Sequence, residues 1–161
     1  MIDKQKQGKK NRTSGRDFEL RVRHDLEKSG WNMCKWMNNV SEPFEQDIGE
    51  WIRKMEPAKR RYNPFMKALS IGNGFPDFIA FQLPENYQNF GIEQEGMIKG
   101  QFNLYLVIGV EVKSNGYLTK EEQEKCKWYL NKKIFSRILI ASKGKKRGEI
   151  VYKEFEEVHN G

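Results

Sequence analysis

The residues from Val107 to Asn115, which read V-I-G-V-E-V-K-S-N, constrain the fold more than any other stretch of the chain. They form an apolar run that carries two charges, Glu111 and Lys113, two positions apart. Because side chains alternate across a strand, a strand here places Glu111 and Lys113 side by side on one face. A carboxylate and an ammonium at the end of a buried strand are costly to desolvate. The pattern therefore indicates either a salt-bridged pair on an edge strand or a functional site.

The elements around this run predict an α/β fold. Thr119 and Glu122 form a capping box that opens a helix through about Asn131, and Ser136–Ser142 is typical of a buried strand. A strand–helix–strand unit of this kind forms a parallel pair of strands. Further strands are predicted at Trp31–Met37, Phe75–Phe81, Phe102–Lys113 and Glu149–Tyr152. We therefore expect a sheet with helices packed on it.

The N-terminal part is predicted to contain an arm and a helix. Residues 1–13 are polar and basic without an apolar pattern, so we expect a flexible basic arm there. Ser14 can cap a helix that starts at Thr13–Ser14, and Gly30 is its natural stop. The buried stripe of this helix consists of apolar residues four positions apart, Phe18, Val22 and Leu26. With 161 residues, the chain has the length of one domain, here residues 14–161.

Two segments lie between the predicted strands. The spacing of apolar residues predicts a helix over Glu45–Met55, within an inserted segment at 40–70, and a second, short helix over Pro64–Leu69. The segment Leu83–Gly100 is polar and contains one proline and three glycines, so it is predicted to be a long loop or an extended hairpin turn.

The charge of the chain favours a polyanionic partner. Lys and Arg number 29 against 22 Asp and Glu, a net charge of +7, which suits nucleic acid but also serves solubility. No apolar run approaches the roughly 20 residues that span a bilayer, and the N-terminus lacks the apolar core of a secretory signal. The two cysteines, Cys34 and Cys126, form no C-x-x-C pair and are expected as thiols in a reducing, intracellular compartment.

Charged residues in apolar surroundings form a candidate site. Asp77 stands at the start of one predicted strand, and Glu111 and Lys113 share a face of the next. Glu19 and Gln123 lie at the margins of the buried stripes of the two helices. Two carboxylates on adjacent strands suit Mg²⁺, which can activate water and orient a phosphodiester. A lysine beside the metal can stabilise developing negative charge or help to deprotonate water.

The order of these residues resembles the PD-(D/E)XK nuclease superfamily. The resemblance rests on Glu19 in an N-terminal helix, Pro76-Asp77, Glu111-Val112-Lys113, and Gln123 in the following helix. The helix G-R-D-F-E-L-R-V-R-H-D-L-E-K-S-G-W is similar to the opening of archaeal-type Holliday junction resolvases. The G-F-P-D-F-I-A-F and E-V-K segments are similar to both those resolvases and virus-type replication-repair nuclease domains. The resemblance spans about residues 15–142, interrupted by 40–70.

The resemblance implies a restriction-endonuclease-like fold, in which helices flank a central mixed β-sheet, and it makes residues 14–161 a nuclease domain. It implies a Mg²⁺-dependent DNA endonuclease, with Mn²⁺ able to substitute, most simply a Holliday junction resolvase that works as a homodimer on a four-way junction. The setting would be the cytoplasm or nucleoid of a prokaryote, or a virus-infected host cell. The lengths of 40–70 and 83–100 leave open another DNA nuclease, for repair or for a specific sequence. A separate alternative is a catalytically silent DNA-binding protein of the same fold.

The resemblance also assigns roles to single residues. The implied metal ligands are the side chains of Asp77, Glu111 and Glu19 and the backbone carbonyl of Val112. Lys113 would act on the nucleophilic water, Gln123 would support the site or touch DNA, and Ser70 is the nearest candidate for the catalytic serine of resolvases. Phosphate contacts are expected from three basic clusters: Lys9, Lys10, Arg12 and Arg16; Lys59, Arg60 and Arg61; and Lys143, Lys145, Lys146 and Arg147.

Overall fold

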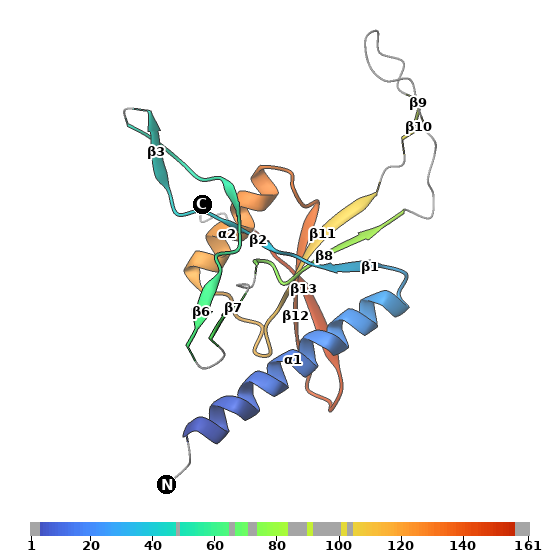
Figure 1. Cartoon of the computed structure of the whole chain (residues 1–161). Coiled ribbons are helices and arrows are strands. Elements are labelled where there is room, and N and C mark those ends of the chain that lie inside the picture. Colours follow the sequence, from blue (N-terminus) through green and yellow to red (C-terminus); the bar gives the residue numbers. More distant parts are fainter. Residues whose placement is uncertain are drawn as a thin grey trace.

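A five-stranded sheet forms the centre of the protein. The computed structural model describes residues 4–47, 49–64, 67–70, 74–83, 90–91, 101–102 and 105–156. The strand order is β1-β8-β11-β12-β13 (Figure 1). The bounds of these strands are Asn32–Lys35 for β1, Phe78–Gln82 for β8, Leu106–Val112 for β11, Arg137–Lys143 for β12 and Ile150–Glu154 for β13.

The sheet is mixed. β11 and β12 run parallel and are joined by helix α2 (Lys120–Asn131), whereas the other three neighbouring pairs are antiparallel. The predicted parallel strand–helix–strand unit and the mixed α/β class are therefore confirmed. The strands expected at Trp31–Met37, Ser136–Ser142 and Glu149–Tyr152 correspond to β1, β12 and β13.

Helices α1 and α2 cover opposite faces of the sheet. Phe78 and Ala80 pack in the core under α1, while Ile79, between them, packs in the core under α2. β12 alternates in the same way, with Ala141 in the first core and Ile140 in the second. Because neighbouring residues of a strand point to opposite faces, each helix has its own core. Among the described residues, no helix combines the length and apolar composition that crossing a bilayer requires.

Helix α1 (Lys4–Lys28) is longer than predicted. The expected start at Ser14 is wrong, because the helix begins at Lys4 and takes in most of the residues assigned to an arm. Lysine, glutamine and arginine are good helix formers, and Gln7 donates a hydrogen bond to Asn11 one turn on, so the polar turns need no buried stripe. The predicted stripe of Phe18, Val22 and Leu26 is buried, and Gly30 follows the helix with a φ of +85°.

Helix α2 begins where the sequence predicts. The Thr119 hydroxyl accepts from the Glu122 N–H at 3.3 Å, and the Thr119 N–H donates to the Glu122 carboxylate at 2.8 Å. These two bonds are the predicted capping box. Cys126 and Tyr129 are buried on the inner side of the helix and pack with Phe135 against the sheet.

The segment 40–70 consists of short antiparallel strand pairs in its described residues. β2 (Asn38–Val40) pairs with β5 (Met55–Pro57), β3 (Phe44–Asp47) with β4 (Glu50–Ile52), and β6 (Arg61–Asn63) with β7 (Ala68–Ser70).

The helices predicted over Glu45–Met55 and Pro64–Leu69 are therefore wrong. The apolar residues with helical spacing do not reach a core, since Trp51 is 66% and Met55 45% exposed. Gly49, with a φ of +82°, turns the chain between β3 and β4.

Two predicted strands are shorter than expected. The strand predicted at Phe75–Phe81 begins only at Phe78, and the one predicted from Phe102 begins at Leu106. Most of Leu83–Gly100 lies outside the described residues. The described pair β9 (Phe90–Gly91) and β10 (Gln101–Phe102) is antiparallel, as an extended hairpin turn requires.

Candidate active site

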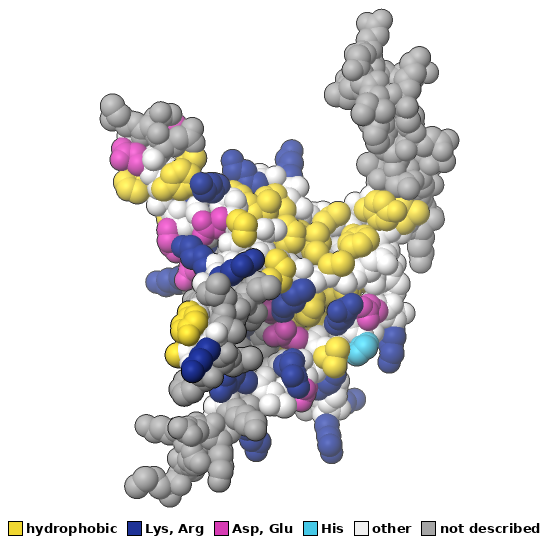
Figure 2. Space-filling view, viewed as in Figure 1, with side chains coloured by type: hydrophobic (Ala, Val, Ile, Leu, Met, Phe, Trp, Pro, Cys, Tyr) yellow, Lys and Arg dark blue, Asp and Glu magenta, His cyan; other side chains and the backbone are white. Residues whose placement is uncertain are grey.

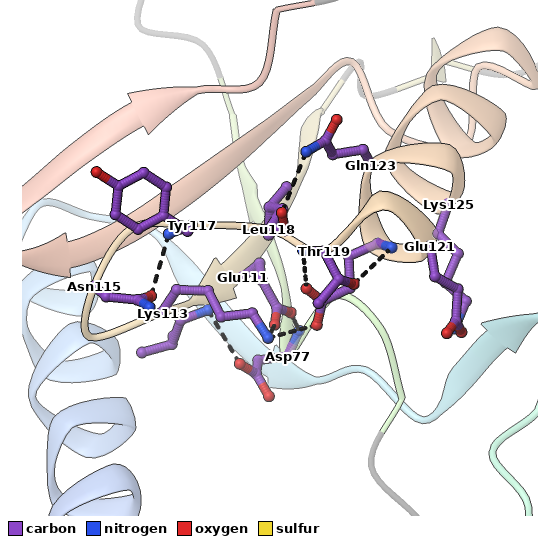
Figure 3. Close-up of polar contacts among 12 residues, drawn as sticks. Asp77, Glu111, Lys113, Asn115, Tyr117, Leu118, Thr119, Glu121, Gln123 and Lys125 are labelled. Carbon is purple, nitrogen blue, oxygen red and sulfur yellow. Dashed lines mark hydrogen bonds and ion pairs between the residues drawn. The ribbon is translucent and has the colours of Figure 1, made fainter.

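Asp77 and Glu111 meet at one end of the central sheet. The antiparallel register pairs Phe78 with Val110, so the residues just beyond them, Asp77 and Glu111, lie opposite each other. The Asp77 N–H donates to Glu111 Oε2 at 3.0 Å, and the Val112 N–H donates to Asp77 Oδ2 at 3.1 Å. Both acidic residues are buried, at 8% and 5% exposure. The two carboxylates predicted from separate strands are thus brought into one cluster (Figure 3).

Burial makes both carboxylates hard to ionise. Desolvation, followed by the negative charge of Asp77, raises the pKa of Glu111 to about 8, although Lys113 opposes the shift. Desolvation also raises the pKa of Asp77, against the opposing positive charge of Lys35. Additional positive charge between the two groups would favour the ionised form of both.

Lys113, the residue that follows β11, lies beside Glu111. Its Nζ is 3.2 Å from Glu111 Oε1 and 2.5 Å from Glu122 Oε1. Val110 and Val112 pack in the core under α1, so Glu111 and Lys113 face the side of α2. Desolvation lowers the pKa of Lys113, but the hydrogen bond to Glu122 and the charge of Glu111 outweigh it and raise the pKa overall.

Glu122 was not predicted as a site residue. Its carboxylate serves two purposes, since one oxygen completes the cap of α2 and the other binds Lys113. Desolvation raises its pKa, but the hydrogen bond from Lys113 and the backbone of Thr119 lower it below the ordinary value. The signal in the sequence was its spacing, because residue 122 lies four positions before Cys126, which is buried on the inner side of α2.

Lys35 is a second lysine of the site that was not predicted. Its Nζ lies 2.8 Å from Glu19 Oε2 and 3.2 Å from Asp77 Oδ1. The predicted residue Glu19 therefore reaches the cluster through this ammonium. Alternation along β1 places Lys35 on the same side as the buried Met33, facing α1, and this was the signal available in the sequence.

Gln123 is not brought into the cluster. Its Nε2 donates to the Leu118 carbonyl at 3.2 Å, and Figure 3 shows it directed away from Asp77 and Glu111. Residue 123 lies on the exposed side of the first turn of α2, so Gln123 does not contact the carboxylates here, and its contact with DNA stays a prediction. Ser70 contributes its backbone to β7, and its side chain lies outside the described residues.

The donor chemistry of the cluster fits a hard divalent cation. In the part of the chain that the structure describes, no three His, Cys, Asp or Glu side chains gather closely enough to hold a metal. Asp77 and Glu111 nevertheless offer carboxylate oxygens, the ligands that Mg²⁺ prefers. One oxygen of each accepts a backbone N–H, and the other faces a lysine ammonium. The oxygens that a cation would use already face positive charge.

The buried thiol near the cluster is not a nucleophile in this arrangement. Cys126 is fully buried in α2, and its pKa is raised to about 12 by burial and by the charges of Glu111 and Glu122. A thiol with this pKa stays protonated near neutral pH, whereas nucleophilic cysteines need a lowered pKa.

A basic groove of about 510 Å³ runs between α1 and the end of β12. It is lined by Lys10, Thr13, Ser14, Asp17, Phe18, Arg21 and Lys143. The Lys143 ammonium and the Arg21 guanidinium each lie 5.5 Å from the centre of the Phe18 ring. The Lys143 N–H donates to the carbonyl of Ser114 at 3.4 Å, so the groove adjoins the residue that follows Lys113.

The other residues proposed to contact DNA are exposed where their side chains are described. Figure 2 shows lysine and arginine side chains over the face that carries α1. The described and exposed members are Lys10, Arg12, Arg16, Lys59, Arg60, Lys143, Lys145, Lys146 and Arg147. The side chains of Lys9 and Arg61 lie outside the described residues.

Fold and site together define a mixed α/β protein with a buried carboxylate cluster, bridged by two lysines, at one end of its sheet. Comparisons of the chain with protein-family models, with curated proteins and with solved structures find no match.

Proposed function

We propose that the protein is a metal-dependent DNA endonuclease of the PD-(D/E)XK type, with a restriction-endonuclease-like fold, that cleaves branched DNA as Holliday junction resolvases do. The observation that carries this proposal is the hydrogen bond from the Asp77 N–H to the Glu111 carboxylate, which brings the two acidic residues together with Lys113 beside Glu111. Two carboxylates can hold the divalent ion that metal-assisted phosphodiester hydrolysis uses, and a lysine beside it can stabilise developing negative charge.

Each residue of the cluster has a role in this proposal. Asp77, Glu111, the Val112 carbonyl and Glu19 would hold Mg²⁺. The metal would lower the pKa of a bound water and offset charge on the leaving oxygen. The raised pKa of Lys113 keeps its Nζ protonated near neutral pH, which favours charge stabilisation at the phosphate over deprotonation of the water. Glu122 would position this ammonium from α2.

In this proposal the basic groove holds the DNA backbone along α1, the helix that also carries Glu19 of the cluster. It begins at Lys143, next to the chain segment that follows Lys113, and continues along α1 to Lys10. Phosphate contacts of this kind release counterions, so binding should weaken steeply with salt. Lys143→Glu should lower both the affinity and the salt slope, whereas Lys127→Glu, on α2, should leave both near the parent values. An equal effect of the two variants would move the DNA path elsewhere.

The proposal is tested with a synthetic four-way junction, a linear duplex and single strands, each with Mg²⁺ or Mn²⁺. We expect cleavage of the junction in preference to the others. Asp77→Asn should abolish cleavage and keep DNA binding, while Glu124→Gln, an exposed carboxylate on α2, should cleave like the parent. Equal rates on junction and duplex would instead indicate a repair or sequence-specific nuclease of the same type.

A second candidate is a catalytically silent DNA-binding protein. It is favoured by the lysine ammonium groups that already face Asp77 and Glu111, because a cluster with this pairing can be purely structural. Binding of DNA without cleavage of any substrate by the parent protein would support this candidate and contradict the nuclease.

A further inference from the structure

We propose that Lys35 is the resident cation of the cluster, which a divalent metal must displace from Asp77 and Glu19 before it can bind. The inference rests on the metal site of the proposed function, but it concerns binding of the metal and not cleavage of DNA. It makes Lys35 a positioning residue that sets how tightly the site takes a divalent ion.

The contacts of Lys35 link three parts of the fold. The residue ends β1, and its Nζ bridges Glu19 of α1 at 2.8 Å and Asp77, just before β8, at 3.2 Å. The ammonium also lies 4.6 Å from the centre of the Phe78 ring. Its side chain is 33% exposed, so a way out to solvent exists. The ammonium thus lies between two of the carboxylates proposed as metal ligands.

The hydrogen bonds of the cluster show for which carboxylate oxygens a lysine and a metal ion would compete. Asp77 Oδ2 is engaged by the Val112 N–H, which leaves Oδ1 as the oxygen for a cation, and Lys35 occupies it. Glu111 Oε2 is likewise engaged by a backbone N–H, and its Oε1 faces Lys113. A metal shared by both carboxylates would therefore meet one lysine at each of them.

The two lysines differ in the ion-pair partners that remain to them after a metal binds. Lys113 has a second partner, Glu122, which is not a proposed ligand, and it can stay there after it releases Glu111. Both partners of Lys35 are proposed ligands, so Lys35 loses both. Lys35 is therefore the residue that a divalent ion replaces, and Lys113 is the one that remains.

Charge balance supports the exchange. When all are ionised, the four carboxylates Glu19, Asp77, Glu111 and Glu122 and the two lysines leave the cluster with two negative charges in excess, and withdrawal of Lys35 exposes a third to the incoming divalent ion. Without the charge of Lys35 the excess would be larger, and the attraction for a divalent ion would be stronger.

The test is a titration of the metal-free protein with Mn²⁺, followed by electron paramagnetic resonance of the unbound ion and by calorimetry. Lys35→Met should tighten Mn²⁺ binding about tenfold or more, since a unit charge a few Å from a divalent ion matters even at the dielectric of water. Lys35→Arg keeps the charge in a bidentate form and should bind Mn²⁺ no more tightly than the parent. Lys127→Met, which removes a partly exposed lysine paired with Glu124, is the matched control.

Thermal unfolding with and without Mn²⁺ gives a second readout. Lys35→Met leaves two carboxylates without their counterion, so it should be less stable in chelator and gain more from Mn²⁺ than the parent. If Lys35→Met folds only with Mn²⁺, that result also supports the exchange. Equal or weaker Mn²⁺ affinity of Lys35→Met, beside a parent that binds the metal and cleaves DNA, would overturn the inference alone. Absence of Mn²⁺ binding in every variant would overturn the metal site as well.

Discussion

Glu111→Gln tests whether ionisation of the buried Glu111 carboxylate lowers the free energy of unfolding, and whether a bound cation restores it. The Glu111 side chain accepts an N–H from Asp77 at 3.0 Å and lies 3.2 Å from the Lys113 ammonium. Glutamine has nearly the same shape and keeps an oxygen acceptor, but it removes the charge and the titration. The substitution therefore isolates the cost of ionising this group in the folded protein.

The direction in which stability changes with pH follows from the raised pKa of Glu111. Glu111 binds its proton more tightly in the folded protein, where its pKa is about 8, than in the unfolded chain, where it is near 4.5. Stability is therefore highest below the unfolded pKa and is lost as the pH rises from 4.5 to about 8. With about 1.4 kcal/mol for each pKa unit, the loss in chelator is on the order of 5 kcal/mol and is complete just above pH 8.

The assay is urea unfolding in chelator at intervals from about pH 5 to 9, followed by the fluorescence of the four tryptophans. At the lowest pH, where Glu111 is mostly protonated, parent and Glu111→Gln should have similar stability. At the highest pH the variant should be the more stable by a few kcal/mol. Saturating Mg²⁺ should restore much of the loss in the parent and change the variant little. Glu124→Gln should follow the parent at every pH.

A difference between parent and Glu111→Gln that stays constant over this range would refute the reasoning. It would mean that Glu111 titrates near its ordinary pKa, so that neither burial nor the neighbouring Asp77 disfavours its charge. A stability difference of the opposite sign at high pH would mean that the Lys113 ion pair outweighs the desolvation of Glu111.

Three further substitutions test the frame around the site, each by the free energy of unfolding in urea. Gly109→Ala should cost roughly 1–3 kcal/mol, because its Cβ would lie 2.8 Å from Pro76 Cγ in a packed core. An unchanged stability would mean that the neighbouring side chains move to make room for the methyl group. Thr119→Ala should lose about 1 kcal/mol with the cap of α2, and Thr119→Ser should keep most of it. Tyr152→Phe should lose about 1 kcal/mol with the 2.8 Å hydrogen bond to Asp25 that joins β13 to α1, unless water replaces it.

Local patterns in the sequence predict many of the helices and strands that surround the site. The capping box at Thr119 needs only residues three positions apart, and the stripe that begins at Phe18 needs only a constant period. Alternation in β11 predicts that Glu111 and Lys113 share a face. Each of these signals depends on neighbours in the chain, so no knowledge of the rest of the fold is required.

Other features depend on what packs against a segment. The apolar residues around Trp51 have helical spacing, but the segment has no core to bury them and forms strand pairs instead. Ser14 could cap a helix, yet favourable polar residues continue α1 back to Lys4. The pairing of Lys35 with Asp77 joins residues 42 positions apart, and only the assembled sheet brings them together.

The crossed hydrogen bonds of Asp77 and Glu111 tie the cluster to the alignment of β8 with β11. Each carboxylate accepts an N–H from the opposite chain segment, so the bonds exist in one strand alignment. A slip by a single residue would turn the side chains to opposite sides of the sheet and break both bonds. A misaligned chain could still bury part of its apolar surface, but it could not assemble the acidic cluster. Any chemistry at this end of the molecule is therefore restricted to copies whose strands have paired correctly.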